Sequence, residues 1–230
     1  RDATLKRVHW AGGVFDNPAL SWTQTSYIQT QMHPYDRYFF DPQLGYTPHR
    51  FLADLKARGY DFSIATTSGK PRVPVSVVAC EYEAYFPPEK IHSGESDFEP
   101  PRFKPDPSVY LLAAEKTAAL PANSVAVEDS TSGVGSAANA KMGLIVGYVG
   151  GSHISDENED GHAGTLMAGS RSDDGRGADI VVRDMRDLVP VVDHFKSAVE
   201  SGEKAPVKFP RALLDGLVDK YWVDEARVVA

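Results

Sequence analysis

Short apolar runs alternate with segments of helical periodicity along much of this chain. Thr47-Pro48 predicts the start of a helix, because threonine is a common N-cap and proline suits the first helical turn. Leu52 and Leu55 lie on its apolar stripe, and Arg58-Gly59 predicts its end. The apolar run at residues 61–66 follows and is typical of a short buried strand.

The same order of elements recurs further along the chain. Asp106-Pro107 predicts the start of a second helix, which precedes an apolar strand at residues 124–127. A third helix is predicted to begin at 130–133 and to lead into a strand at 144–149, and 178–182 has the pattern of one more strand. Strands that alternate with helices are typical of parallel βαβ units, so we expect an α/β fold with a doubly wound parallel sheet. Ligands bind such sheets beyond the carboxyl ends of the strands.

Two later stretches lack this alternation. Residues 154–177 are acidic and glycine-rich, so we expect a mobile loop there, with His153 and His162 at the surface. Residues 201–230 begin with a proline-containing linker and end in a predicted extension helix. The apolar stripe of that helix comprises Leu213, Leu214, Leu217, Tyr221 and Trp222. So much apolar surface must pack on the domain itself or on a partner.

Composition narrows the choice of function only slightly. The 230 residues are 42% hydrophobic and 24% charged, which is ordinary for a globular protein. A net charge of −8 without a Lys/Arg run argues against nucleic-acid binding, and no stretch approaches the roughly 18–20 apolar residues of a membrane span. The single cysteine, Cys80, permits no intrachain disulfide, which suits an intracellular, reducing compartment. Its apolar neighbours predict a buried, inert thiol.

Polar residues with a family signature follow several of the predicted strands. The four stretches are Phe62-Ser-Ile-Ala-Thr-Thr-Ser, Lys104-Pro-Asp-Pro, Val127-Glu-Asp-Ser-Thr-Ser-Gly-Val and Gly147-Tyr-Val-Gly-Gly-Ser-His. Their order and spacing resemble the haloacid dehalogenase-like hydrolase superfamily, in its phosphoglycolate phosphatase and phosphoglucomutase subgroup. The resemblance covers residues 46–188 and implies a site for a phosphorylated small molecule.

The resemblance implies a role for each of these polar side chains. The hydroxyl of Thr66, with Thr67 beside it, would hold the transferring phosphoryl group. Lys104 would balance the charge of the phosphate and of the nucleophile. Asp129 and Glu128 would hold Mg²⁺, which takes few carboxylates and completes its shell with waters and phosphate oxygens. We expect these groups to converge at the carboxyl edge of the sheet.

The first motif of the family, Asp-x-Asp-Gly after the central strand, has no clear counterpart here. One alignment places Ala11 at the nucleophile, and an alanine cannot attack phosphorus. A second alignment keeps Asp16 as nucleophile but places Pro18 at the general acid and base. A third possibility is a first motif upstream of Arg1. The cap domain of the subgroup also looks reduced, to about residues 17–46, so we assign residues 1–200 to the core with this reduced cap and 201–230 to the extension.

Three functions therefore stay open at this point. The first is a domain that has lost phosphatase activity and serves as a structural or accessory subunit of a larger intracellular assembly, in the cytoplasm or an organelle matrix such as the mitochondrion. The second is an active Mg²⁺-dependent phosphomonoesterase that acts on a small phosphorylated metabolite. The third is a sensor that binds such a metabolite without turnover.

Overall fold

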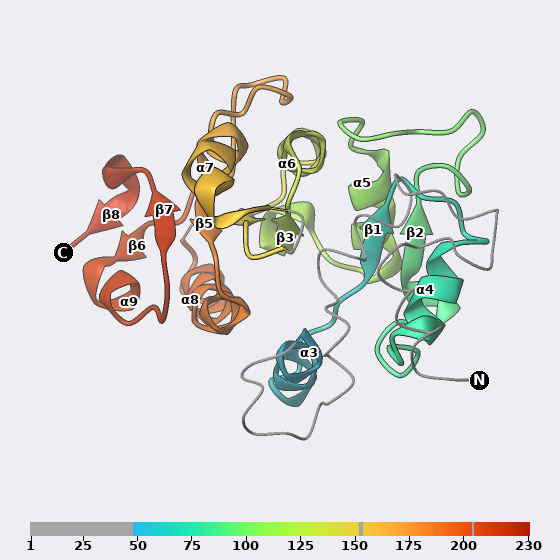
Figure 1. The fold of residues 1–230 in the computed structure, drawn as a ribbon, viewed down its shortest axis with the longest axis horizontal. Helices are drawn as coiled ribbons and strands as arrows, with labels where there is room; N and C mark the ends of the chain where they lie inside the picture. The colour runs from blue at the N-terminus through green and yellow to red at the C-terminus, as the bar shows by residue number, and fades with distance from the viewer. Residues whose placement is uncertain (1–47, 152–153, 204) are drawn as a thin grey trace. The chain divides into compact units, whose positions relative to one another are not determined.

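The computed structural model describes residues 48–151, 154–203 and 205–230, drawn as coloured ribbon in Figure 1. These residues belong to two compact units. The N-terminal unit extends to Phe103 and includes Gly151, and the C-terminal unit comprises Lys104–Gly150 and Ile154–Ala230. Each unit has its own hydrogen-bonded strands and its own buried residues, and each is described by itself.

The N-terminal unit is built around two parallel strands, β1 (Ile64–Thr66) and β2 (Ile91–Ser93). Its helices are α3 (Pro48–Ala57), α4 (Val73–Ala79) and the short η3 (Pro88–Lys90). Thr66 lies opposite Ser93, so both strands end at the same edge. The buried core of this unit consists of Leu52, Ile64, Val73, Val77, Cys80, Tyr82 and Ile91.

Helix α3 ends as its sequence predicts. Gly59 has φ +75°, the left-handed conformation that glycine adopts without a steric penalty. The N–H of Tyr60 donates to the carbonyl of Leu55, and the N–H of Gly59 donates to that of Lys56, which together form a Schellman cap. The prediction of a buried Cys80 is also confirmed.

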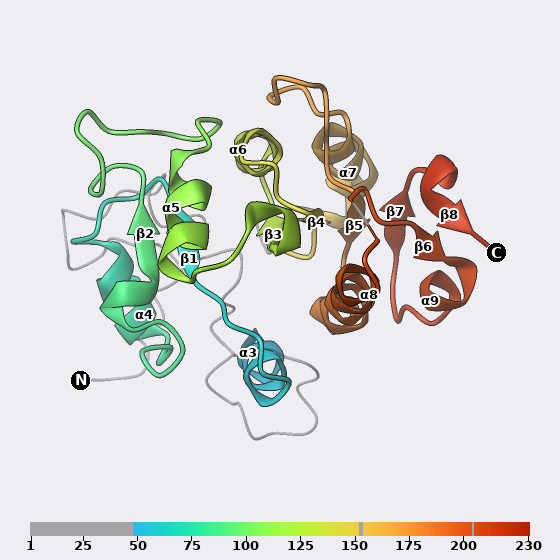
Figure 2. The same cartoon turned by 180° about the vertical axis from the view of Figure 1, so that it is seen from behind.

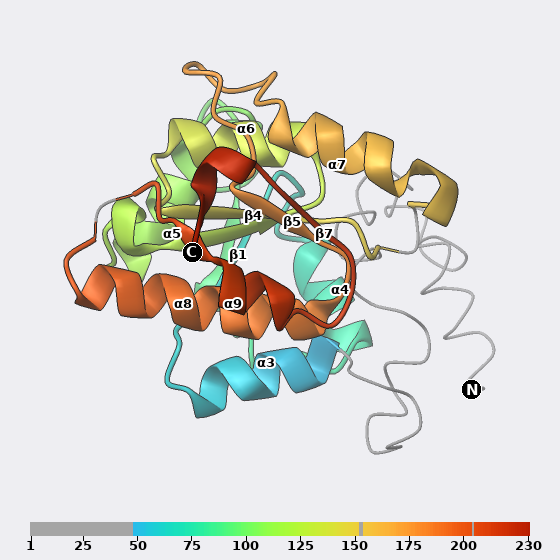
Figure 3. The same ribbon diagram turned by 90° about the vertical axis from the view of Figure 1, so that its left-hand side faces the viewer.

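The C-terminal unit has a layered arrangement (Figures 1–3). Strands β3 (Val125–Glu128), β4 (Leu144–Tyr148) and β5 (Ile180–Val182) are parallel neighbours in that order. Helices α6 (Thr131–Asn139) and α7 (Glu159–Met167) cover one face of the sheet, and α8 (Leu188–Glu200) covers the other. The predicted doubly wound α/β arrangement is therefore confirmed.

Three further helices of this unit precede β3 or α8. Helix α5 (Ser108–Lys116) precedes β3, and the carboxylate of Asp106 accepts a hydrogen bond from the N–H of Ser108, as the predicted helix start requires. The single-turn helices η4 (Pro121–Asn123) and η6 (Met185–Asp187) precede β3 and α8.

Residues 154–177 were expected to form a mobile loop, and the structure corrects this expectation. The segment contains η5 (Asp156–Asn158) and the nine-residue α7. Ala163 and Leu166 of α7 are fully buried, and Glu159 is buried as well. The acidic, glycine-rich composition hid a helix whose inner face has only two apolar residues.

The C-terminal extension also differs from its prediction. A C-terminal helix is present, but α9 covers only Arg211–Asp215, so Leu217, Tyr221 and Trp222 are not part of it. Tyr221 and Trp222 lie instead on β7 (Tyr221–Val223), which pairs antiparallel with β5 and covers the edge of the sheet. A small parallel pair, β6 (Phe209–Pro210) with β8 (Val228–Val229), and η7 (Glu225–Arg227) complete the extension.

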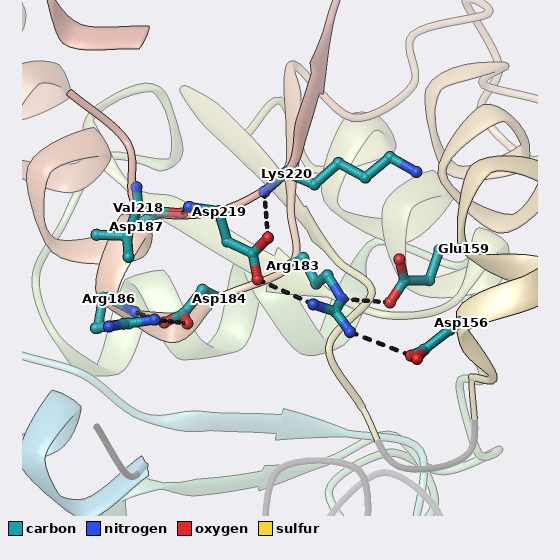
Figure 4. A network of polar contacts seen from close by, with 9 residues as sticks. All are labelled: Asp156, Glu159, Arg183, Asp184, Arg186, Asp187, Val218, Asp219 and Lys220. Carbon is teal, nitrogen blue, oxygen red and sulfur yellow. Dashed lines mark hydrogen bonds and ion pairs between the residues drawn. The ribbon is translucent and has the colours of Figure 1, made fainter. Parts of the chain in front are cut away.

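Polar contacts attach this extension to the rest of the C-terminal unit (Figure 4). The carboxylate of Asp187 accepts hydrogen bonds from the N–H groups of Val218, at 2.6 Å, and Asp219, at 3.2 Å. Arg183 donates to the carboxylate of Asp219 at 3.0 Å. The extension is therefore attached to the chain's own C-terminal unit, and Leu214 of the predicted apolar stripe is buried there at 1% exposed.

No helix among the described residues is long and apolar enough to cross a membrane.

Candidate functional site

Lys104 and Glu128 form a buried ion pair at the carboxyl end of β3. The ammonium of Lys104 donates to Oε1 of Glu128, and the hydroxyl of Tyr110 donates to the same oxygen. The side chain of Lys104 is 6% exposed and that of Glu128 is 0% exposed. Tyr110 comes from α5, and the centroid of its ring is 4.9 Å from Nζ of Lys104. The lysine is thus held by a carboxylate and by an aromatic face.

The second oxygen of Glu128 has no such partner. Oε2 is buried and accepts no hydrogen bond from any described residue. It packs on the first turn of α6, where a Cβ at Gly133 would lie only 1.8 Å away. Burial raises the pKa of the Glu128 carboxyl, the charge of Asp129 adds to this effect, and the charge of Lys104 opposes it. The ionisation of the Glu128 carboxyl therefore depends on the charge of Lys104.

Asp129 links β3 to α6. It is 7% exposed and precedes Ser130, whose hydroxyl caps α6 by accepting from the N–H of Gly133. The backbone carbonyl of Asp129 is 2.7 Å from Nε2 of His162, which belongs to α7. His162 was expected at the surface, and the structure instead makes it a half-buried neighbour of this turn. The sequence motifs do not reveal this contact, because the composition of residues 154–177 predicts a loop where α7 lies.

Thr66 and Thr67 lie in the N-terminal unit. Thr66 is 3% exposed at the end of β1, and its hydroxyl accepts from the N–H of Ser68 at 3.1 Å. The hydroxyl of Ser93, at the end of β2, donates to the carbonyl of Ser68 at 2.8 Å. Thr67 is half-buried in the turn between Thr66 and Ser68. The hydroxyls of Thr66 and Ser93 thus both contact the backbone of Ser68 at this strand end, and the phosphate-holding role of Thr66 and Thr67 stays a prediction.

Ion pairing ties the two turns that follow these strands. Lys70 contacts the carboxylate of Asp97 at 2.5 Å, and its own N–H donates to the hydroxyl of Ser96. Asp97 also accepts from the N–H of Ser93 at 2.8 Å. Partial burial by itself raises the pKa of Asp97, but the hydrogen bonds from Lys70 and Ser93 outweigh it and leave the pKa lowered. The turn after Thr66 is therefore fixed by both hydroxyl and charged groups.

The described residues offer an incomplete set of metal ligands. They contain no cluster of three or more His, Cys, Asp or Glu that could hold a metal ion. Asp129 fits one carboxylate of a Mg²⁺ site, since Mg²⁺ binds through one or two carboxylates together with phosphate and water. Glu128 fits less well, because one of its oxygens is occupied by Lys104 and Tyr110 and the other faces Gly133. Ala11 and Asp16 lie outside the described residues, so their competing alignments stay predictions.

The structure pairs Lys104 with Glu128 in the C-terminal unit, and Asp129 follows Glu128 in the chain. The roles expected for these residues stay predictions. Thr66 and Thr67 lie at a strand end of the N-terminal unit. Tyr110, Gly133 and His162 are neighbours of the site that the motifs alone did not reveal.

Comparison with known proteins identifies the family and the fold of the chain. The sequence profile described as haloacid dehalogenase-like hydrolase matches residues 22–146, which is more than half of the chain. No curated protein matches.

Among solved structures, a conserved haloacid dehalogenase-like protein of unknown function from Agrobacterium tumefaciens is 22% identical, with a TM-score of 0.52. That match covers 83% of this chain and 89% of the other. A family hydrolase from Deinococcus radiodurans, crystallised with bound phosphate and sodium, is 22% identical with a TM-score of 0.50 and covers 70% and 61% of the two chains. A family IA, variant 3 hydrolase from Entamoeba histolytica is 23% identical with a TM-score of 0.50 and covers 64% and 59%. At these identities the structures establish a shared fold.

Proposed function

Because the chain belongs to the haloacid dehalogenase-like hydrolase family, we propose that it keeps the anion-binding and metal-binding groups of the family site but lacks the hydrolytic step. In this role it is an accessory or structural subunit of a larger intracellular assembly. The observation that carries the proposal is the buried pair of Lys104 and Glu128 beside Asp129. It is set against the alignment that places Ala11 at the nucleophile of the first motif.

The buried pair supports retained binding for an energetic reason. Removing two charges from water costs several kcal/mol per ion, and mutual attraction alone often fails to offset that cost. A chain under selection for stability alone would be expected to carry apolar residues at these positions. Lys104 and Glu128 occupy these positions, with Tyr110 bonded to Glu128 and Gly133 leaving room for it, which supports use of the lysine as a charge for a phosphate group.

Loss of the chemical step rests on the first motif. Phosphoryl transfer in this family needs a carboxylate nucleophile, and with Ala11 at that position Lys104 and Asp129 have no bond-forming group to assist. Mg²⁺, when bound, would offset the negative charge of phosphate oxygens, and Asp129 is the side chain suited to hold it. Binding without turnover is the expected result.

An assay of the full chain with para-nitrophenyl phosphate and Mg²⁺ tests the loss of turnover. We expect no hydrolysis above that of an Asp129→Ala variant. Titration calorimetry with Mg²⁺ and inorganic phosphate should nevertheless detect saturable binding, which Asp129→Ala weakens. Asp174→Ala is the matched control, because Asp174 is an exposed acid of the same unit, and it should bind like the unaltered chain.

A second function, an active Mg²⁺-dependent phosphomonoesterase, is supported by the same intact pair if Asp16 is the nucleophile. Turnover that Asp16→Asn abolishes would establish that function and overturn our proposal. Absence of both turnover and binding would leave the accessory role without its binding component. The accessory role itself predicts that Asp16→Asn, which removes the rival nucleophile, complements loss of the gene as well as the unaltered sequence does.

A further inference from the structure

A histidine outside the family motifs contacts the turn that carries the candidate metal ligand. We propose that His162 is a positioning residue for Asp129, an inference that rests on the proposed binding function. Nε2 of His162 lies 2.7 Å from the backbone carbonyl oxygen of Asp129. The two residues are far apart in sequence and come from different elements, α7 and the turn between β3 and α6.

The contact acts on the backbone carbonyl of Asp129 itself. A carbonyl oxygen only accepts hydrogen bonds, so Nε2 of His162 must carry the proton and donate it. The bond holds the plane of the peptide that follows the Cα of Asp129, while the Ser130 cap holds the start of α6 on the other side of that peptide. Donors of this kind, one step removed from a ligand, commonly set its orientation.

Helix α7 depends on polar contacts to keep His162 in place. Only Ala163 and Leu166 anchor its apolar face. Its first turn is held by Arg183, which donates to the buried carboxylate of Glu159 at 2.5 Å (Figure 4). The same guanidinium binds Asp219 of the C-terminal extension at 3.0 Å.

The extension contacts α7 directly as well. The indole N–H of Trp222 donates to the carboxylate of Asp160 at 2.9 Å, and Lys220 lies 2.7 Å from the same carboxylate. A continuous set of contacts therefore runs from β7 through the first turn of α7 to His162 and the carbonyl of Asp129. The extension, which the family motifs do not include, therefore contacts the helix that carries His162.

Two measurements on the full chain test the role of His162. The first is long-range ¹⁵N NMR of the imidazole, in which the unaltered chain should show a protonated Nε2. The second is calorimetric titration with Mg²⁺ and with inorganic phosphate. His162→Leu removes the donor, and we expect Mg²⁺ binding about 10–100-fold weaker. His162→Gln keeps an N–H donor at a similar reach and should restore most of the affinity.

A second histidine provides a matched control. Nε2 of His194, a half-buried residue of α8, lies 2.7 Å from the carbonyl oxygen of Lys208. His194→Leu removes the same kind of bond, so it reports the purely structural effect of losing it. We expect it to leave Mg²⁺ affinity unchanged.

The outcomes separate this inference from the function on which it rests. No binding by the unaltered chain would overturn both. Normal binding that His162→Leu leaves unchanged, or an unprotonated Nε2 in the unaltered chain, would overturn only the positioning role. Equal losses in His162→Leu and His162→Gln would also count against it, because the glutamine keeps the donor. If His162→Leu does not fold, the NMR signature and the glutamine variant decide the question.

Discussion

Replacing Lys104 by methionine is the sharpest test of the electrostatics described here. The substitution keeps most of the side-chain volume but leaves the fully buried carboxylate of Glu128 without its positive partner. Breaking a buried ion pair from one side costs about 3–5 kcal/mol of the free energy of unfolding. A further Glu128→Gln change should recover most of that loss, because a neutral amide can still accept from the hydroxyl of Tyr110.

Urea denaturation followed by far-UV circular dichroism measures these differences. Lys141→Met is the matched control, since Lys141 pairs with Asp174 on the surface, where the two side chains are 65% and 46% exposed. An exposed pair of this kind contributes about 0.2–1 kcal/mol. The reasoning would be refuted if Lys104→Met lost no more stability than Lys141→Met, or if the double variant were no more stable than Lys104→Met alone.

The same variant has a predictable dependence on pH. Burial already raises the pKa of Glu128, and removing the charge of Lys104 raises it further. The folded state then binds a proton more readily than the unfolded chain, so the stabilisation from that proton is present at low pH and is lost as pH rises through the folded pKa. The deficit of Lys104→Met should therefore be larger at neutral pH than at about pH 5.

Three further outcomes follow from other contacts. Gly133→Ala should lose about 1–3 kcal/mol of stability, because its Cβ would collide with the Glu128 carboxylate. Gly164→Ala should gain about 0.5–1 kcal/mol, because the new Cβ meets open space on α7. Thermal unfolding compares the two variants. Asp97→Asn should flatten the acid side of a plot of stability against pH. The pKa of Asp97 is lower in the folded than in the unfolded chain, so its charge stabilises the fold at pH values above the unfolded pKa, and this stabilisation is lost as pH falls through the folded pKa. Arg227→Leu should cost about 1.5–3 kcal/mol by removing an ion pair to a buried aspartate, and hydrogen exchange should rise across residues 207–229.

The parallel core could be read from the sequence because its signals are local. An apolar run followed by a capped helix specifies each βαβ unit, and the strands at 125–128 and 144–148 lie within one residue of their predicted bounds. The end of α3 at Gly59 was equally legible, because only a glycine adopts that backbone conformation without strain. Lys104, Glu128 and Asp129 were singled out by the motifs that resemble the family, which are also short and local.

The errors fall where local signals are weak. Helix α7 has two apolar anchors and depends on Arg183, whose partner Glu159 is distant in sequence. The spacing of Tyr221 and Trp222 fits the apolar stripe of a helix. The edge of β5, however, forms backbone hydrogen bonds with residues 221–223, which makes a strand more favourable for them. Neither fact can be read from a window of neighbouring residues.

The sequence by itself determined the α/β class, the family and the identity of the charged residues at the strand ends. Each of these depends on residue type and spacing within a few turns of chain. Only the tertiary structure decided that Lys104 is paired with Glu128, that Gly133 leaves room for that carboxylate, and that His162 donates to the Asp129 turn. These contacts join segments that are distant in sequence. Their strength depends on how deeply the groups are buried, which residue spacing does not specify.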